Sequence, residues 1–262
     1  MVRGRAGIFR LAAIDLDGTL IRSDGTISDR TKRAIRATKL DIVIVTARGP
    51  ATIHELAAEL GARGRAICSN GALVVDLETR AIVRERRLET EVALRLVHEL
   101  RERLPGIRFA VEHEGFAHEP GFSAWGWTPP PETRVADVVE LLADPATKLI
   151  LRHADYDTVA IQDLARELAG EELTVVASGS EAVEVTAAGV NKATAVAELG
   201  YAPVEVVAFG DYPNDIPLLT WAGLGVAMGN AHPDVVAVAD EVTATNDEDG
   251  VAVVLERLAT AA

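Results

Sequence analysis

An apolar run near the N-terminus, residues 11–14, stops at two carboxylates, Asp15 and Asp17, which are followed by Gly18 and Thr19. A short run of this kind is typical of a buried strand in a parallel sheet, and such sheets bind ligands at the carboxyl ends of their strands. Two acids, a glycine that permits a turn and a hydroxyl are suited to Mg2+ and phosphate. The same residues are also common in a plain turn after a strand, so the rest of the chain has to decide.

Strands and helices alternate in the first and last parts of the chain. Residues 42–45 and 66–68 are further apolar runs after amphipathic helices, and the run 204–209 ends in Gly-Asp-Tyr-Pro-Asn-Asp. This alternation predicts an α/β protein with a Rossmann-like three-layer core around a parallel sheet. The middle of the chain mixes hairpins and helices, which predicts an inserted α+β domain. The predicted boundaries are 1–84 and 186–262 for the discontinuous core and 85–185 for the inserted domain.

Composition argues against several kinds of partner. The 262 residues include 26 basic and 40 acidic side chains, which gives a formal net charge of −14. Nucleic acid or an anionic membrane would require clustered basic side chains, so we expect neither. No apolar run approaches the roughly 20 residues that span a bilayer, and we expect a cytoplasmic protein. Cys68 is the only cysteine, which excludes an internal disulfide and predicts a small buried residue.

Four segments resemble, in the right order, the four motifs of the haloacid dehalogenase-like phosphatases. They are Asp15-Leu-Asp-Gly-Thr-Leu, Val45-Thr46-Ala47-Arg48, Gly189-Val-Asn-Lys192 and Gly210-Asp211-Tyr-Pro-Asn214-Asp215. The insertion between the second and third motifs is similar to that of the Cof-type subfamily, whose cap is an α+β domain. Ser69-Asn70-Gly-Ala and Thr245-Asn-Asp-Glu-Asp-Gly-Val-Ala also resemble that subfamily. The resemblance covers nearly the whole chain.

The resemblance implies a role for each motif residue. Asp15 would be the nucleophile that forms an aspartyl-phosphate, and Asp17 the general acid and then the general base. Lys192 would neutralise charge on the transferred phosphoryl group. A Mg2+ ion would be held by Asp15, the backbone carbonyl of Asp17, and Asp211, with Asp215 orienting that shell. Phosphate would be bound by Thr46, Ala47, Arg48, Asn70, Lys192 and Asn214.

More than one function is compatible with these motifs. The leading prediction is a Mg2+-dependent phosphatase of small phosphorylated metabolites, with sugar phosphates as one candidate class. A phosphomutase uses the same four motifs and passes the phosphoryl group to a second alcohol instead of water. A non-catalytic module that binds phosphate ligands is the alternative from another class. The sequence carries no signal for the oligomeric state.

Single residues also have plainer interpretations. Arg48 is equally well explained as a solvated side chain at a helix entry, and Lys192 as a first-turn lysine, although a cation near a helix N-terminus favours a nearby anion. In the predicted cap, four side chains are candidates to line a substrate site, but surface histidines and aromatic residues that pin a loop are commoner. No substrate is assigned from these four, which are His113, His118, Trp125 and Trp127.

The second and fourth motifs depart from the family pattern. Ala47 stands where the family usually has glycine, which would matter if the backbone needed a positive φ at that position. Pro213 and Pro217 lie in the fourth motif, where small or apolar residues are more usual, and they predict a stiffer helix start. Neither change removes a predicted ligand or the nucleophile.

Overall fold

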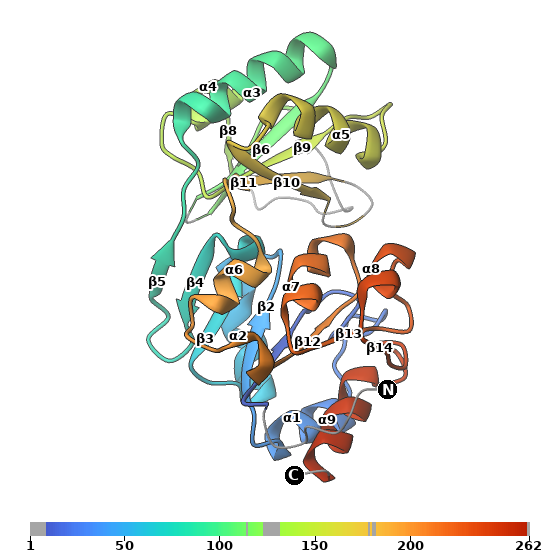
Figure 1. Ribbon diagram of the computed structural model, residues 1–262. Coiled ribbons are helices and arrows are strands. Elements are labelled where there is room, and N and C mark those ends of the chain that lie inside the picture. Colours follow the sequence, from blue (N-terminus) through green and yellow to red (C-terminus); the bar gives the residue numbers. More distant parts are fainter. Residues whose placement is uncertain (1–8, 114, 123–131, 178, 180–181, 261–262) are drawn as a thin grey trace. The chain divides into compact units, whose positions relative to one another are not determined.

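The computed structural model describes residues 9–113, 115–122, 132–177, 179 and 182–260 (Figure 1). The chain divides into two compact units, which we call the core unit and the inserted unit. The core unit consists of Met1–Val83 and Asn191–Ala262, and the inserted unit is Arg84–Val190. Among the described helices, none combines the length and the apolar character needed to cross a membrane.

An eight-stranded sheet forms the centre of the core unit, with the strand order β14-β13-β12-β1-β2-β3-β4-β5. The strands from β14 through β3 pair in parallel, and β4 runs antiparallel to β3. Their bounds are β1 Leu11–Ile14, β2 Asp41–Val45, β3 Arg65–Cys68, β4 Leu73–Asp76, β5 Ile82–Glu85, β12 Val206–Gly210, β13 Leu224–Ala227 and β14 Glu241–Val242. The predicted α/β fold with a parallel sheet is therefore confirmed.

Helices cover both faces of this sheet. Helices α1 (Asp29–Ala37), α2 (Ile53–Leu60) and α9 (Gly250–Thr260) pack on one face, and α6 (Lys192–Ala197), α7 (Ile216–Trp221) and α8 (Pro233–Val238) on the other. Along β1, Ala12 and Ile14 contact the first layer while Leu11 and Ala13 contact the second. Because both faces are buried, the strand is apolar at every position.

Local signals fix several boundaries in the core unit. The Ser28 hydroxyl accepts a hydrogen bond from the Thr31 N–H and begins α1, and Gly61 ends α2 with a φ of 75°. Cys68 is buried, as the sequence predicts. The described part of this unit also contains short 3-10 helices, namely η1 Pro50–Thr52, η2 Ser69–Gly71, η3 Pro203–Glu205 and η4 Pro213–Asp215. The sequence did not predict α8 or β14, which are too short to show a hydrophobic period.

The inserted unit is an α+β domain, as the mixed pattern predicts, with the strand order β10-β11-β9-β6-β7-β8. Helices α3, α4 and α5 pack on one face of this sheet around an apolar cluster (Figure 1). The bounds are α3 Thr90–Arg103, β6 Arg108–Glu112, β7 Phe116–His118, β8 Arg134–Val135, α4 Val138–Leu141, β9 Lys148–Arg152, α5 Thr158–Ala169, β10 Leu173–Ala177 and β11 Val183–Ala187. A buried lysine, Lys148, lies 2.9 Å from Glu184 and 3.3 Å from Glu112.

Two short elements of this unit are not visible in the sequence pattern. The strand β8 is followed by the short helix α4, which begins where the Asp137 side chain accepts a hydrogen bond from the Val139 N–H. The strand β7 was not predicted. Trp125 and Trp127, two of the four candidate cap residues, lie outside the described residues.

Candidate active site

Four parallel strands deliver polar residues to one edge of the core sheet. The strands β12, β1, β2 and β3 are neighbours, so their carboxyl ends lie side by side. Asp211, Asp15 and Thr46 directly follow the first three of these strands, and η2, which contains Asn70, follows β3. The edge therefore gathers residues from three of the four sequence motifs, and the remaining motif begins α6 on one face of the sheet.

Lys192 of α6 links two of the carboxylates. Its Nζ lies 2.6 Å from Asp15 Oδ1 and 2.5 Å from Asp215 Oδ1, and all three side chains are buried. Asn191 holds the start of the helix, because its side chain accepts from the N–H of Thr194, whose hydroxyl accepts from the Asn191 N–H. Burial opposes the charge on Lys192, but the two carboxylates outweigh burial and raise the pKa of the ammonium group. Lys192 is therefore a buried, ion-paired side chain and not an ordinary first-turn lysine.

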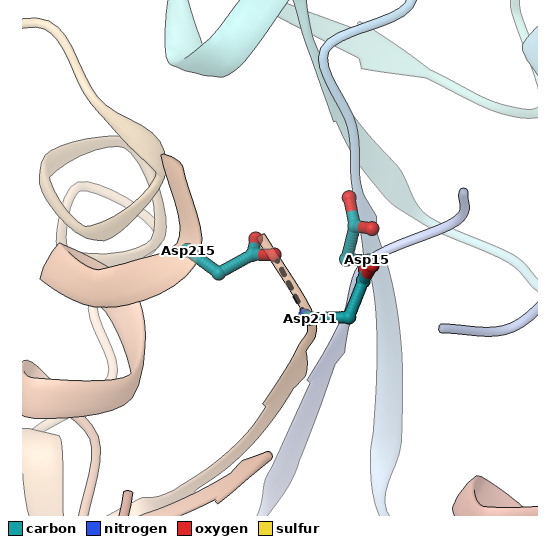
Figure 2. A group of neighbouring side chains, drawn as sticks. All are labelled: Asp15, Asp211 and Asp215. Carbon is teal, nitrogen blue, oxygen red and sulfur yellow. Dashed lines mark hydrogen bonds between the residues drawn. The ribbon is translucent and has the colours of Figure 1, made fainter. Parts of the chain in front are cut away.

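Asp15, Asp211 and Asp215 form an acidic cluster, in which one oxygen from each side chain lies within 4.8 Å of the others (Figure 2). Burial raises the pKa of Asp15 well above its usual value, although Lys192 opposes this effect. Burial and the nearby Asp215 raise the pKa of Asp211 to about 7. The cluster thus holds more negative charge than its single lysine offsets.

Charge and spacing both suit a small divalent cation in the acidic cluster. Octahedral Mg2+ with ligands at about 2.1 Å separates neighbouring oxygens by about 3.0 Å and opposite oxygens by about 4.2 Å. Oxygens that already lie within 4.8 Å of one another need only a small movement to meet this geometry. The residues present therefore fit the ion that the motifs imply.

The fourth motif and the first motif hold each other in place. Thr19 Oγ1 donates to Asp211 Oδ1 over 2.9 Å, and Asp215 Oδ2 accepts from the N–H groups of Asp211 (3.0 Å; Figure 2) and Tyr212 (3.1 Å). A Cβ atom on Gly18 would lie 2.2 Å from Asp211 Oδ2, so a larger residue there would displace the Asp211 carboxylate. Thr19 supplies the hydroxyl that the sequence predicts beside the acids of the first motif, and in the structure this hydroxyl contacts the Asp211 carboxylate.

Arg48 forms a two-pronged ion pair with Asp17. Its Nε lies 2.8 Å from Asp17 Oδ2 and its Nη2 lies 2.5 Å from Oδ1, with both side chains about half exposed. The hydrogen bonds that Arg48 donates to Asp17 raise the pKa of the guanidinium. Arg48 is thus not merely a solvated residue at a helix entry. Its ion pair with Asp17 links the second motif to the first.

The second motif and η2 form a second polar group around Asn214. Its Nδ2 donates to Asn70 Oδ1 over 3.0 Å, while its own Oδ1 is buried without a hydrogen-bond partner among the described residues. The Asn70 N–H donates to the Thr46 carbonyl, and the Thr46 hydroxyl accepts from the Arg48 N–H. Ala47 does not have a positive φ, so the backbone does not require the glycine that the family usually has.

The family profile of the haloacid dehalogenase-like hydrolases matches residues 12–255. The chain belongs to this family. The match extends through the core unit and the inserted unit, and confirms the resemblance of the four motifs to Cof-type phosphatases.

Known haloacid dehalogenase-like proteins support the same assignment. The chain is 33% identical over 250 residues to the 5-amino-6-(5-phospho-D-ribitylamino)uracil phosphatase of Bacillus subtilis, with 93% of each protein covered. It is 30% identical over 263 residues to the pyridoxal phosphate phosphatase of Escherichia coli, with 93% of this chain and 96% of that protein covered. A phosphatase of the superfamily from Bacteroides thetaiotaomicron superimposes with a TM-score of 0.80 at 27% identity, covering 98% and 97% of the two chains. This member of the family is a phosphoric monoester hydrolase.

The two cap histidines that the sequence singles out, His113 and His118, contact backbone carbonyls. His113 lies 3.4 Å from the Pro145 carbonyl and 3.3 Å from that of Leu141, while His118 lies 2.8 Å from the carbonyl of Glu119. His118 is buried, so the expectation of a surface histidine is wrong for this residue. Among the described residues of this hydrolase, the aspartate cluster is the only group that could hold a metal ion.

Proposed function

We propose that this hydrolase is a Mg2+-dependent phosphatase of small phosphorylated metabolites and works through an aspartyl-phosphate on Asp15. The observation that carries the proposal is the buried Asp15 carboxylate, held 2.6 Å from the Lys192 ammonium and beside Asp211. A carboxylate in this setting has a fixed direction and a cation beside it. Both features favour attack on an anionic phosphoryl group.

The reaction divides into two displacements at phosphorus. In the first, an Asp15 oxygen forms a bond to phosphorus while the bond to the leaving oxygen breaks. In the second, water attacks phosphorus, the bond to Asp15 breaks, and inorganic phosphate leaves. A bound Mg2+ ion would supply charge neutralisation and would be held by Asp15, Asp211 and the carbonyl of Asp17, with Asp215 orienting them. Lys192 would stabilise the Asp15 carboxylate before the first step and would offset negative charge on the phosphoryl group once it is bound to Asp15.

Asp17 is the proposed proton carrier. It would donate a proton to the leaving alcohol in the first step and accept one from the attacking water in the second. Asp17 is 55% exposed at its side chain whereas Asp15 is 8% exposed, so Asp17 can exchange protons with solvent while Asp15 stays sheltered. Thr46, Ala47, Arg48, Asn70 and Asn214 are the proposed phosphate-positioning residues.

The test is phosphate release from a panel of phosphorylated metabolites in the presence of Mg2+. The panel contains pyridoxal phosphate and 5-amino-6-(5-phospho-D-ribitylamino)uracil, the substrates in the relatives' names, together with sugar phosphates. We expect turnover that EDTA removes and Mg2+ restores. Asp15→Asn should lower kcat more than about a thousandfold without unfolding the protein, whereas the same exchange at the exposed Asp29 should not.

Other outcomes of the panel would favour the other functions. Saturable binding of several members without phosphate release would indicate a non-catalytic binding module. Transfer of the phosphoryl group to a second sugar hydroxyl, detected by product analysis with a sugar bisphosphate, would indicate a phosphomutase. An Asp15→Asn variant with the parent rate would disprove the proposed nucleophile.

A further inference from the structure

Two asparagines from the C-terminal part of the core unit grip the turn that follows β1. Asn230 Nδ2 donates to the Gly18 carbonyl over 2.8 Å, and Asn246 Nδ2 donates to the Ile21 carbonyl over 2.9 Å. The two are joined to each other, because the Asn246 N–H donates to Asn230 Oδ1 over 2.9 Å. We call this pair the asparagine clasp.

The gripped turn has little regular structure of its own. The N–H groups of Thr19, Leu20 and Ile21 all donate to one carbonyl, that of Leu16, at 3.3, 2.9 and 2.8 Å. Gly18 has a φ of 77°, which a helix does not allow. These three hydrogen bonds to one acceptor close a tight turn. They do not involve the carbonyl groups of Gly18 and Ile21, which are held by other segments of the chain. The clasp binds these two carbonyls.

The turn also carries proposed site residues. Asp17 precedes Gly18 directly, and Thr19 follows it and donates to the Asp211 carboxylate. A rotation of the peptide at Gly18 would therefore move both the proposed proton carrier and the partner of a proposed metal ligand. Small displacements of such groups cost large factors in rate.

We propose that Asn230 and Asn246 are positioning residues, which fix the Gly18 and Ile21 carbonyls and thereby set the direction of Asp17 and Thr19. The inference rests on the proposed function for its effect on the reaction. Neither asparagine belongs to the four motifs. The clasp is exposed at Asn230, so its hydrogen bonds contribute little to global stability. Loss of the clasp should therefore change the reaction rate more than it changes the free energy of unfolding.

The kinetic test compares two leaving groups. An alkyl phosphate needs a proton from Asp17 as its alcohol leaves, whereas p-nitrophenyl phosphate releases a stable anion and needs little help. Asn230→Ala should lower kcat for the alkyl phosphate by about tenfold more than kcat for p-nitrophenyl phosphate. The nearly isosteric Asn230→Asp should do the same, because it keeps the acceptor for Asn246 but loses the donor to Gly18.

A matched control perturbs the same loop outside the turn. Asp247 accepts from the Ser23 N–H and hydroxyl, so it ties the loop to a residue beyond Ile21. Asp247→Asn should leave the ratio of the two rates unchanged. Because Asn230 and Asn246 act through each other, their double alanine variant should cost less than the product of the two single effects.

Amide hydrogen exchange gives a readout that does not depend on turnover. We expect the Leu20 and Ile21 amides to exchange about tenfold faster in Asn230→Ala than in the parent, with the thermal midpoint unchanged. An equal fall in kcat for the alkyl phosphate and for p-nitrophenyl phosphate, together with unchanged amide exchange at Leu20 and Ile21, would overturn the inference. The phosphatase proposal would stay intact. A parent protein without turnover would instead refute the proposed function, and the exchange rates alone would then decide whether the clasp holds the turn.

Discussion

Replacing Gly18 by alanine tests whether the first motif is shaped around Asp211. The residue has a φ of 77°, and its added Cβ would lie 2.2 Å from Asp211 Oδ2 and 2.7 Å from its Cγ. The left-handed backbone alone costs about 1–2 kcal/mol for alanine. Carbon and oxygen need about 3.3 Å between them, so the carboxylate must also move by about 1 Å. A shift of that size at this proposed metal ligand is expected to lower kcat by about a hundredfold.

Gly25 provides a matched control for this substitution. It has a φ of 83°, but a Cβ there meets nothing within 4 Å. Gly25→Ala should therefore show the same backbone cost in urea unfolding, about 1–2 kcal/mol, without loss of activity. Gly18→Ala should show that cost together with weaker Mg2+ binding by calorimetry and a fall in kcat. If the two variants had equal activity and equal Mg2+ affinity, the reasoning about crowding at Asp211 would be refuted.

Three further predictions follow from the burial of the site. Lys192→Met should destabilise the protein by about 3–5 kcal/mol in urea unfolding, because it leaves two buried carboxylates without their cation, whereas Lys39→Met at an exposed position should change little. Gly71→Ala should displace the start of α6, since its Cβ would lie 2.4 Å from the carbonyl oxygen of the N-cap residue, and should lose more stability than Gly64→Ala, which has open space. The raised pKa of Asp211, about 7, means that Mg2+ must displace a proton at lower pH. Calorimetry should show affinity falling by up to about tenfold per pH unit below about 7, and the metal-free protein should become less stable as pH rises from about 4 to about 7; affinity that is flat between pH 6 and 8 would contradict this.

The strands that carry the site could be predicted because they are buried on both faces. Residues 11–14 have no polar position, so their burial and their end at Asp15 are visible in the sequence itself. The same pattern cannot show which distant residues meet that end. Asn230 lies 212 positions from Gly18, and Asn246 lies 225 positions from Ile21. The hydrophobic pattern of a single segment does not indicate such contacts. They can be seen only once the order of the strands in the sheet is known.

The inserted unit shows a second limit of sequence reasoning. The residues of β9 read as a mainly apolar strand that begins with Lys148, and this strand alone does not show whether the lysine is buried. In the structure Lys148 is buried, because Glu112 on the paired strand β6 and Glu184 on β11 supply the charge that allows it to leave water. The strand β7 is only three residues long and includes the buried His118. Ion pairs between strands depend on register, which the sequence of one strand does not contain.

The charges of the acidic cluster and of Lys192 explain why the proposed site needs a divalent cation. Asp15, Asp211 and Asp215 carry three negative charges when ionised, and Lys192 carries one positive charge, which leaves −2. A divalent cation would bring that sum to zero, so the metal-free cluster must hold protons that the metal-bound cluster does not need. Burial and the nearby Asp215 raise the pKa of Asp211, which adds to this excess of negative charge. Lys192 contacts Asp15 and Asp215, yet burial still raises the pKa of Asp15 well above its usual value. The lysine alone therefore does not balance the cluster, and a bound divalent cation would favour the ionised form of both Asp15 and Asp211.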